Sequence, residues 1–208
     1  MIKALSRTSV DLKTTEVISS LLQILNTKKA RYNDKVETLE KEYARLIGVK
    51  EAVAFPYSRT GTYYALMALE LQEGDEVIMP AFTFWVDAAM VVMAGLKPVF
   101  VDVNFETQSI DTALIENAIT PRTKVIYPTH LNGLPADMDQ IMKIAKKHDL
   151  RVMEDCARSC GATYNDKRIG SFDIGSFSFG YGKSFYGFGG AMVTSDDAAF
   201  IKKLRDLK

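Results

Sequence analysis

A lysine and an aspartate are the residues of this chain whose settings most clearly suggest chemistry. Lys183 lies in a glycine-rich and aromatic run that begins at Gly175 and follows a short apolar segment. Asp155 ends another apolar segment that begins at Leu150. A lysine in a tight, partly apolar loop can lose its proton more easily and act as a nucleophile. An aspartate at a buried strand end can pair with a cationic ring nitrogen.

These two groups are the ones that pyridoxal 5′-phosphate (PLP) requires. The lysine forms a Schiff base with the aldehyde, and the aspartate keeps the pyridine nitrogen protonated so that the ring accepts electrons. Lys183 and Asp155 therefore predict PLP as the cofactor. Each residue alone also fits an ordinary role, because most lysines are solvated and an aspartate after a strand often caps the next helix.

A phosphate-binding turn is predicted over residues 57–62, just before a predicted helix. Free N–H groups at a helix N-terminus, small residues and hydroxyl side chains suit a phosphate, and Thr60, Gly61 and Thr62 supply them. Ser178, ahead of Lys183, is expected to assist. Taken alone, the turn is a weak signal, because Ser/Thr-rich segments more often simply cap a helix.

Two aromatic residues and a histidine follow other predicted strands. Phe84 and Trp85 come directly after one strand, where an aromatic ring can stack on a flat cofactor or pack in the core. Adjacent side chains point in different directions, so we expect at most one of them to stack. His130 ends another strand, where a catalytic role and a packed, hydrogen-bonded role are both open.

Metal chemistry is not predicted. Cys156 and Cys160 are the only cysteines, and neither histidine is close to them in the sequence. Two ligands fall short of a structural zinc site, so buried thiols beside a strand end are the preferred interpretation.

Apolar segments that alternate with amphipathic ones predict an α/β fold, with a mostly parallel seven-stranded sheet sandwiched by helices. In such sheets ligands gather at the carboxyl ends of the strands, where Asp155, Ser178 and Lys183 are expected. Strands are predicted over 52–55, 76–79, 98–102, 124–128, 151–154, 174–179 and 191–194. Helices are predicted over 13–27, 35–47, 61–71, 84–94, 111–118, 137–148 and from 196 onward.

The bulk properties fit an ordinary globular protein. A length of 208 residues suits an N-terminal helical segment, residues 1–34, and one cofactor-binding domain, residues 35–208. The formal net charge of zero gives no global attraction to nucleic acid or membrane. We expect a cytoplasmic protein, because no signal peptide or spanning segment is recognised. The last residues form a charged helical pattern that resembles an interruption rather than a domain edge.

In their order, several motifs resemble the DegT/StrS sugar aminotransferases, PLP enzymes of the aspartate aminotransferase fold (fold type I). The resemblance begins near residue 35 and covers nearly all of the chain that follows. The matching stretches are residues 60–62, 73–80, 97–103, 119–124, 130–139, 154–157, 176–179 and 189–194.

The resemblance implies a role for each candidate residue. Lys183 would be the catalytic residue, which carries the cofactor and then moves a proton between substrate and cofactor carbons. Asp155 would pair with the ring nitrogen, and Phe84 would stack on the ring. The turn at residues 60–62, with Ser178, would hold the phosphate.

Three departures from the family are visible. Arg158 stands where the family usually has a glutamine that contacts the cofactor's phenolic oxygen, and Cys160 stands where histidine is common. Family members also continue into a small C-terminal domain, so this chain would be the large domain only. Lys183 itself is retained, which argues against the related sugar dehydratases that carry histidine there.

The resemblance implies an aminotransferase that moves an amino group, expected from glutamate, onto a nucleotide-linked keto sugar. The products would enter surface polysaccharides or glycosylated metabolites. The implied assembly is a homodimer, and no nucleic-acid or membrane partner is expected. Two alternatives stay open: a truncated, non-catalytic PLP-binding or dimerising module, and a PLP-dependent sugar dehydratase.

Overall fold

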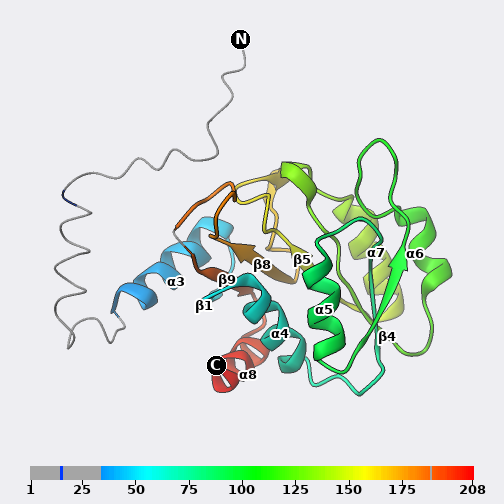
Figure 1. The fold of residues 1–208 in the computed structure, drawn as a ribbon, viewed down its shortest axis with the longest axis horizontal. Coiled ribbons are helices and arrows are strands. Elements are labelled where there is room, and N and C mark those ends of the chain that lie inside the picture. Colours follow the sequence, from blue (N-terminus) through cyan, green and yellow to red (C-terminus); the bar gives the residue numbers. More distant parts are fainter. Residues whose placement is uncertain (1–14, 16–33, 188) are drawn as a thin grey trace, which may run out of the picture.

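The structure, a computed structural model, describes residue 15, residues 34–187 and residues 189–208 (Figure 1). The predicted helix over 13–27, apart from residue 15, and most of the predicted N-terminal segment lie outside the described residues. Within the described ranges, no helix combines the length and the apolar character that crossing a bilayer requires.

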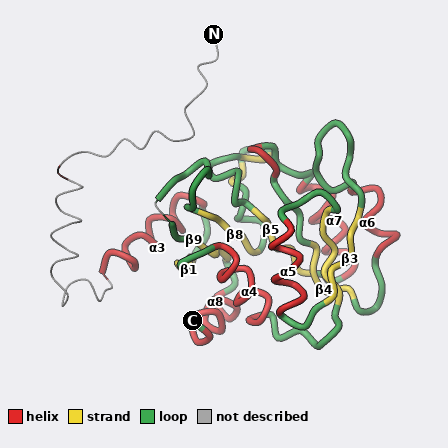
Figure 2. Tube along the Cα trace, viewed as in Figure 1, coloured by secondary structure: helices red, strands yellow, loops and turns green. Residues whose placement is uncertain are grey.

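Seven strands form one sheet, in the order β1-β9-β8-β5-β4-β2-β3 (Figure 2). The pairs β1–β9 and β9–β8 are antiparallel, and the other four pairs are parallel. The predicted α/β class and the mostly parallel seven-stranded sheet are therefore confirmed. The strands are β1 (Glu51–Phe55), β2 (Glu76–Pro80), β3 (Lys97–Val101), β4 (Thr123–Ile126), β5 (Arg151–Asp155), β8 (Ile174–Ser178) and β9 (Ala191–Ser195).

The burial of each strand follows its place in the sheet. Every residue of β2, β8 and β9 is buried, as expected for strands covered on both faces. The edge strand β3 contains Pro98, whose missing N–H is tolerated where one side has no partner strand. Phe100 on the same strand is 54% exposed. Asp155 and Ser178 thus end interior strands, β5 and β8.

Helices cover both faces of the sheet. One face packs against α4 (Ser58–Ala68), α5 (Trp85–Met93) and α8 (Ala198–Leu207), with Val53 and Val193 turned toward them. The other face packs against α3 (Asp34–Ile47), α6 (Thr112–Ala118) and α7 (Met138–His148). Ala52 and Met192 turn toward α3, and Ile126 and Val152 turn toward α6 and α7. The alternation of neighbouring residues between two apolar layers is what the period of a strand requires.

Several features differ from the sequence-based prediction, among them the bounds of α4 and an additional hairpin. Helix α4 begins at Ser58, three residues earlier than predicted, and this earlier start changes which of its residues reach the ligand edge. A small hairpin, β6 (Thr163–Tyr164) and β7 (Lys167–Arg168), was not predicted. Its turn, residues 165–166, has φ of 47° and 61°, which suits the Asn-Asp pair found there.

Candidate active site

The strand ends open into a cavity of about 450 Å³, a size typical of small-molecule sites. Its wall combines the ends of β5 and β8, the N-terminal ends of α4 and α5, and the loop that follows β8. It therefore lies at the predicted edge of the sheet. Five of the predicted site residues line it: Phe84, Asp155, Arg158, Ser178 and Lys183.

Lys183 points its ammonium toward the ring of Phe84. The distance from Lys183 Nζ to the ring centroid is 6.0 Å. Burial lowers the pKa of the Lys183 ammonium, the charge of Asp155 opposes this, and the charge of Arg158 lowers the pKa further. A lowered pKa leaves more of the lysine as the neutral amine, which is the nucleophilic form.

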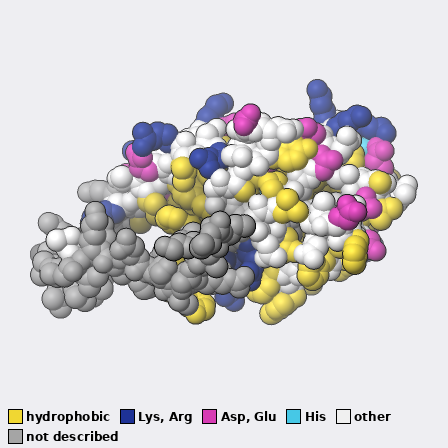
Figure 3. All heavy atoms as spheres, turned by 90° about the horizontal axis from the view of Figure 1, so that it is seen from above, with side chains coloured by type: hydrophobic (Ala, Val, Ile, Leu, Met, Phe, Trp, Pro, Cys, Tyr) yellow, Lys and Arg dark blue, Asp and Glu magenta, His cyan; other side chains and the backbone are white. Residues whose placement is uncertain are grey.

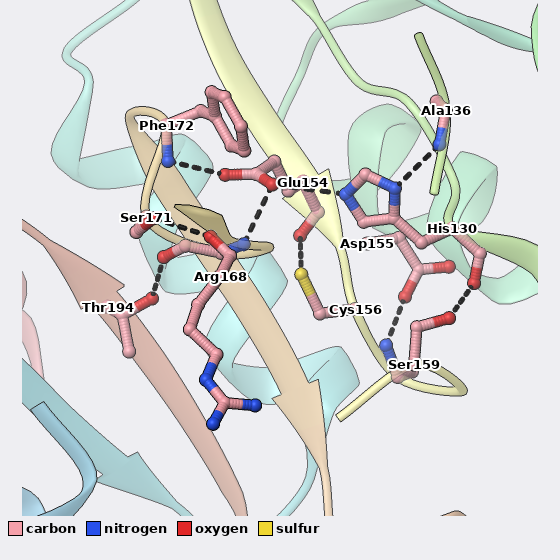
Figure 4. A network of polar contacts seen from close by, with 12 residues as sticks. His130, Ala136, Glu154, Asp155, Cys156, Ser159, Arg168, Ser171, Phe172 and Thr194 are labelled. Atoms are coloured by element: carbon pink, nitrogen blue, oxygen red, sulfur yellow. Dashed lines mark hydrogen bonds and ion pairs between the residues drawn. The ribbon is translucent and has the colours of Figure 1, made fainter. Parts of the chain in front are cut away.

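Asp155 and Glu154 leave β5 in different directions (Figure 4). Asp155 is 7% exposed and lines the cavity, and its Oδ1 accepts a hydrogen bond from the N–H of Ala157 at 2.9 Å. Burial raises the pKa of Asp155, while the Ala157 N–H and the positive charge of Lys183 favour the carboxylate. The two effects oppose each other, and the carboxylate becomes more favourable when a cation approaches.

Of the two neighbouring aromatics, only Phe84 lines the cavity. It precedes the first turn of α5 in an extended conformation, and its side chain is 58% exposed. Trp85 is 72% exposed and is not part of the cavity wall. The structure thus gives Phe84 the position from which a ring could stack on a ligand, and its stacking role stays a prediction.

The start of α4 lies differently from the predicted phosphate turn. Because the helix begins at Ser58, Gly61 and Thr62 turn toward the sheet. A Cβ at Gly61 would lie 3.0 Å from Val193 Cγ2, so the glycine allows close packing there. The Thr62 hydroxyl lies 3.2 Å from Ser176 Oγ and 3.3 Å from Tyr127 Oη, in the protein interior. The predicted contact of this hydroxyl with a phosphate is therefore corrected.

Ser58 and Arg59 line the cavity at this helix start, together with Tyr57. Sequence reasoning passed over them in favour of Thr60, which holds the third helical position and whose role stays a prediction. The first N–H groups of a helix lack partners within it, and no side chain caps this helix. The helix start thus offers N–H groups, a hydroxyl and a guanidinium on one side of the cavity.

Asp87 is a further cavity residue that sequence reasoning missed. It is 9% exposed and accepts a hydrogen bond at 3.2 Å from the hydroxyl of Tyr127. The sequence-based prediction for this segment named only the aromatic residues Phe84 and Trp85, as candidates for stacking. The available signal was that Asp87 is the single charged residue of an otherwise apolar helix.

His130 does not line the cavity and pairs with Glu154 in the interior (Figure 4). Its Nδ1 accepts the N–H of Ala136 at 3.0 Å, so the proton lies on Nε2, which donates to Glu154 at 3.0 Å. Glu154 also accepts the N–H groups of Gly170 at 2.7 Å and Phe172 at 2.9 Å. The packed, hydrogen-bonded interpretation of His130 is therefore the one that the structure supports.

Neither cysteine lines the cavity, and both pack in the apolar cluster that contains Tyr43 of α3. Cys156 is fully buried and its thiol lies 3.7 Å from the carbonyl oxygen of Glu154, while Cys160 lies 3.2 Å from the hydroxyl of Tyr43. Burial raises the pKa of the Cys156 thiol, which keeps it protonated and unreactive. The polar atoms of His130, Glu154 and Cys156 lie within 4.8 Å of one another, but hydrogen bonds already engage them.

Glu154→Gln should lower the free energy of unfolding by about 3 kcal/mol, because a glutamine offers one acceptor to donors that now share a buried carboxylate. Urea unfolding measures the loss. The matched control is Glu116→Gln, which removes the carboxylate from an exposed pair with His148 at 2.9 Å and should change stability little. Equal effects of the two substitutions would contradict the structural role of Glu154.

Arg158→Gln should raise the pKa of Lys183, since the guanidinium charge is one of the causes that lower it. The reactivity of Lys183 toward an amine-specific acylating reagent, followed against pH by mass spectrometry, should therefore move to higher pH. Arg168→Gln is the control, because Arg168 contacts the carbonyl oxygen of Gly161 outside the cavity. An unmoved profile in Arg158→Gln would show that this charge does not act on Lys183.

Comparison with known proteins identifies the family of this chain. The profile of the DegT/DnrJ/EryC1/StrS aminotransferase family matches residues 11–208. The UDP-N-acetyl-3-dehydro-alpha-D-glucosamine 3-aminotransferase of Acidithiobacillus ferrooxidans is 46% identical over 195 residues, which are 93% of this chain and 53% of that protein. The chain thus spans about half the length of this relative.

Solved structures show the same architecture. An aminotransferase from Psychrobacter cryohalolentis superposes with a TM-score of 0.89 at 35% identity, over 94% of this chain and 50% of that one. The Escherichia coli GDP-4-keto-6-deoxy-D-mannose-3-dehydratase, solved with hydrated PLP, superposes with a TM-score of 0.86 at 29% identity, over 95% and 52%. The expectation of fold type I is thereby confirmed, and PLP is confirmed as the cofactor of this kind of protein. The chain belongs to the DegT/DnrJ/EryC1/StrS aminotransferase family.

Proposed function

We propose that the protein is a PLP-dependent aminotransferase that places an amino group on a nucleotide-linked keto sugar. The observation that supports this most is the arrangement of Lys183, Asp155 and Phe84 around one cavity of about 450 Å³. A nucleophilic lysine, a buried carboxylate and an aromatic face are the groups that the cofactor requires. All three groups line the same cavity, so the cavity fits PLP.

The cavity residues divide the binding of PLP between them. Phe84 offers its ring as a stacking face, and Asp155 offers a carboxylate to the ring nitrogen. Ser58, Arg59 and the first N–H groups of α4 offer hydrogen bonds and positive charge to the phosphate, and Ser178 adds a hydroxyl. The separation of the carboxylate from these phosphate donors gives the ligand one preferred orientation.

Lys183 is the residue of this chain that would attach the cofactor and transfer the proton. When bound, PLP provides an electron sink for the bond that is broken at the amino-bearing carbon. Lys183 Nζ would hold the cofactor covalently at rest, then take a proton from that carbon and return it on the cofactor side. Its lowered pKa suits this role, because the amine must be neutral to accept a proton.

The names of the relatives support a substrate class for this chain. The Acidithiobacillus protein is named for a UDP-linked keto amino sugar. We propose the same class of acceptor here, glutamate as the amino donor, and products that enter surface polysaccharides or glycosides. A dehydratase is the second candidate, because one superposed structure is a sugar dehydratase. Retention of Lys183 favours the aminotransferase.

A homodimer is also proposed. Helix α5 and the segment just before it expose large apolar side chains to solvent. Apolar side chains also line the lower edge of the face viewed in Figure 3. Exposed apolar surface of this extent is typical of a contact region. Size exclusion with light scattering tests the proposal, and a monomer at micromolar concentration would contradict it. The exposed residues are Phe82, Phe84, Trp85, Val92 and Met93.

The function is tested by product analysis. The protein, loaded with PLP, is incubated with UDP-N-acetyl-3-dehydro-glucosamine with and without glutamate. An amino sugar that forms only with glutamate would support the aminotransferase. A deoxygenated sugar would indicate the dehydratase, and the absence of any product from a panel of nucleotide-linked keto sugars would favour a non-catalytic module.

A further inference from the structure

A second buried carboxyl group lies in the cavity, and the proposed chemistry does not use it. Asp87 is the third residue of α5 and lines the cavity with Asp155 and Lys183. It is 9% exposed, on a helix whose other residues carry no charge. A buried carboxylate without a cationic partner is costly, so such a group is expected to be satisfied by hydrogen bonds or to stay neutral.

Asp87 ends a chain of buried hydroxyl groups. The Tyr127 hydroxyl donates to Asp87 Oδ1 at 3.2 Å and lies 3.3 Å from Thr62 Oγ1. Thr62 in turn lies 3.2 Å from Ser176 Oγ. None of these three hydroxyl residues lines the cavity, so the chain meets the ligand space only at Asp87. The hydrogen bond from Tyr127 therefore holds the Asp87 carboxyl in place from the protein interior.

The charges that face Asp87 are of both signs. Asp155 faces it from β5, and Lys183 faces it from the loop after β8. From α4, Arg59 lines the same cavity, and Arg158 does so from the loop after β5. Strand β3 also packs on α5, and Lys97 is the one charged residue of this strand. Lys97 lies at the start of the strand, and its ammonium is bonded to Glu76.

These surroundings decide which carboxyl carries a proton. Burial raises the pKa of Asp87 well above its usual range, and the charge of Asp155 raises it further, against the hydroxyl of Tyr127 and the charge of Lys183. Asp155 has an N–H donor in Ala157 and the nearby charge of Lys183 to hold its carboxylate. Two interacting carboxyls in a buried site do not both ionise easily, so we expect the proton on Asp87, which lacks the N–H donor that Asp155 has.

We propose that Asp87 is a second carboxyl group of the cofactor site, held neutral beside the charged Asp155, and that the pair sets how strongly the ring nitrogen is bound. The inference rests on the proposed function. A cationic ring nitrogen at Asp155 favours a second negative charge nearby, so binding promotes the release of the Asp87 proton to water. Asp87 acts through Asp155 and is a positioning residue.

The first test uses the ligand-free protein. Carboxyl ¹³C NMR of aspartate-labelled protein is recorded against pH, in the wild type and in Asp87→Asn. One resonance should titrate well above the other aspartates and be missing in Asp87→Asn. Asp102→Asn, at an exposed position outside the cavity, should leave that high resonance in place. If the resonance lost in Asp87→Asn titrates with the majority, the proposal is overturned.

Tyr127→Phe provides a second variant in case Asp87→Asn does not fold. It removes the hydroxyl that favours the Asp87 carboxylate, so the high transition should move to still higher pH. A transition that does not move would show that it belongs to another aspartate, and would overturn the assignment to Asp87.

The second test adds pyridoxamine 5′-phosphate, which has no aldehyde and cannot attach to Lys183. The Asp87 transition should move to lower pH on binding. By linkage, the affinity of the wild type should rise with pH, relative to Asp87→Asn, between the two transition midpoints. If pyridoxamine 5′-phosphate binds but the Asp87 transition does not move, the proposed coupling between ligand binding and the ionisation of Asp87 is overturned. Absence of binding to either protein would count against the proposed function, and with it the role of Asp87 toward the ring.

Discussion

Lys183→Ala is expected to abolish covalent attachment of PLP and to slow the half-reaction with glutamate by on the order of 10²–10⁴-fold. The substitution removes both the amine that holds the cofactor and the group that moves the proton. The rate is measured in a single turnover, from the change in cofactor absorbance after glutamate is added. Methylamine in the buffer should restore part of the rate, because it replaces a proton acceptor of similar chemistry.

Lys167→Ala is the matched control for this substitution. Lys167 also faces an aromatic ring, with Nζ at 4.3 Å from the centroid of Phe172, but it lies outside the cavity. Its removal should leave attachment and rate unchanged. If Lys183→Ala retained attachment, another lysine would have to hold the cofactor. Equal loss in both variants would show that the effect is not specific to Lys183.

Asp155→Asn is expected to slow the same half-reaction by on the order of 10²–10³-fold and to weaken the binding of pyridoxamine 5′-phosphate. The asparagine keeps the shape of the side chain and the hydrogen bond from Ala157, but it carries no negative charge to pair with a protonated ring nitrogen. The loss should therefore appear in the rate and affinity without a comparable loss of stability.

The pH dependence separates this effect from misfolding. The pKa of Asp155 is raised by burial, so in the wild type the carboxylate is lost as the pH falls toward that raised value. The rate of the wild type should fall on the acid side for this reason, whereas Asp155→Asn should lack this acid limb. Asp102→Asn should follow the wild type. An acid limb that persists in Asp155→Asn would assign it to a different group.

The sequence predicted the parts of the site that depend on the ends of strands. Asp155 and Ser178 lie at the ends of short apolar segments, and the alternation of strands and helices brings such ends to one edge of a sheet. Lys183 follows in a loop whose glycines are evident in the sequence. For these residues, local pattern and topology were enough.

The remaining residues depend on contacts between distant segments. Helix α4 begins three residues earlier than its apolar pattern indicates, which turns Thr62 into the interior and brings Arg59 to the cavity. The environment of Asp87 depends on Tyr127, 40 residues away in sequence, and on the opposing charge of Asp155. No periodicity in the sequence reports which hydroxyl meets which carboxyl across a packed sheet.

The measurement that tests the central claim most directly is reductive trapping. The protein is incubated with PLP, its visible spectrum is recorded, the complex is reduced with borohydride, and the modified peptide is mapped by mass spectrometry. The account predicts a visible absorption band and a label on Lys183. Labels scattered over exposed lysines, with no band, would contradict the assignment of this cavity as a cofactor site.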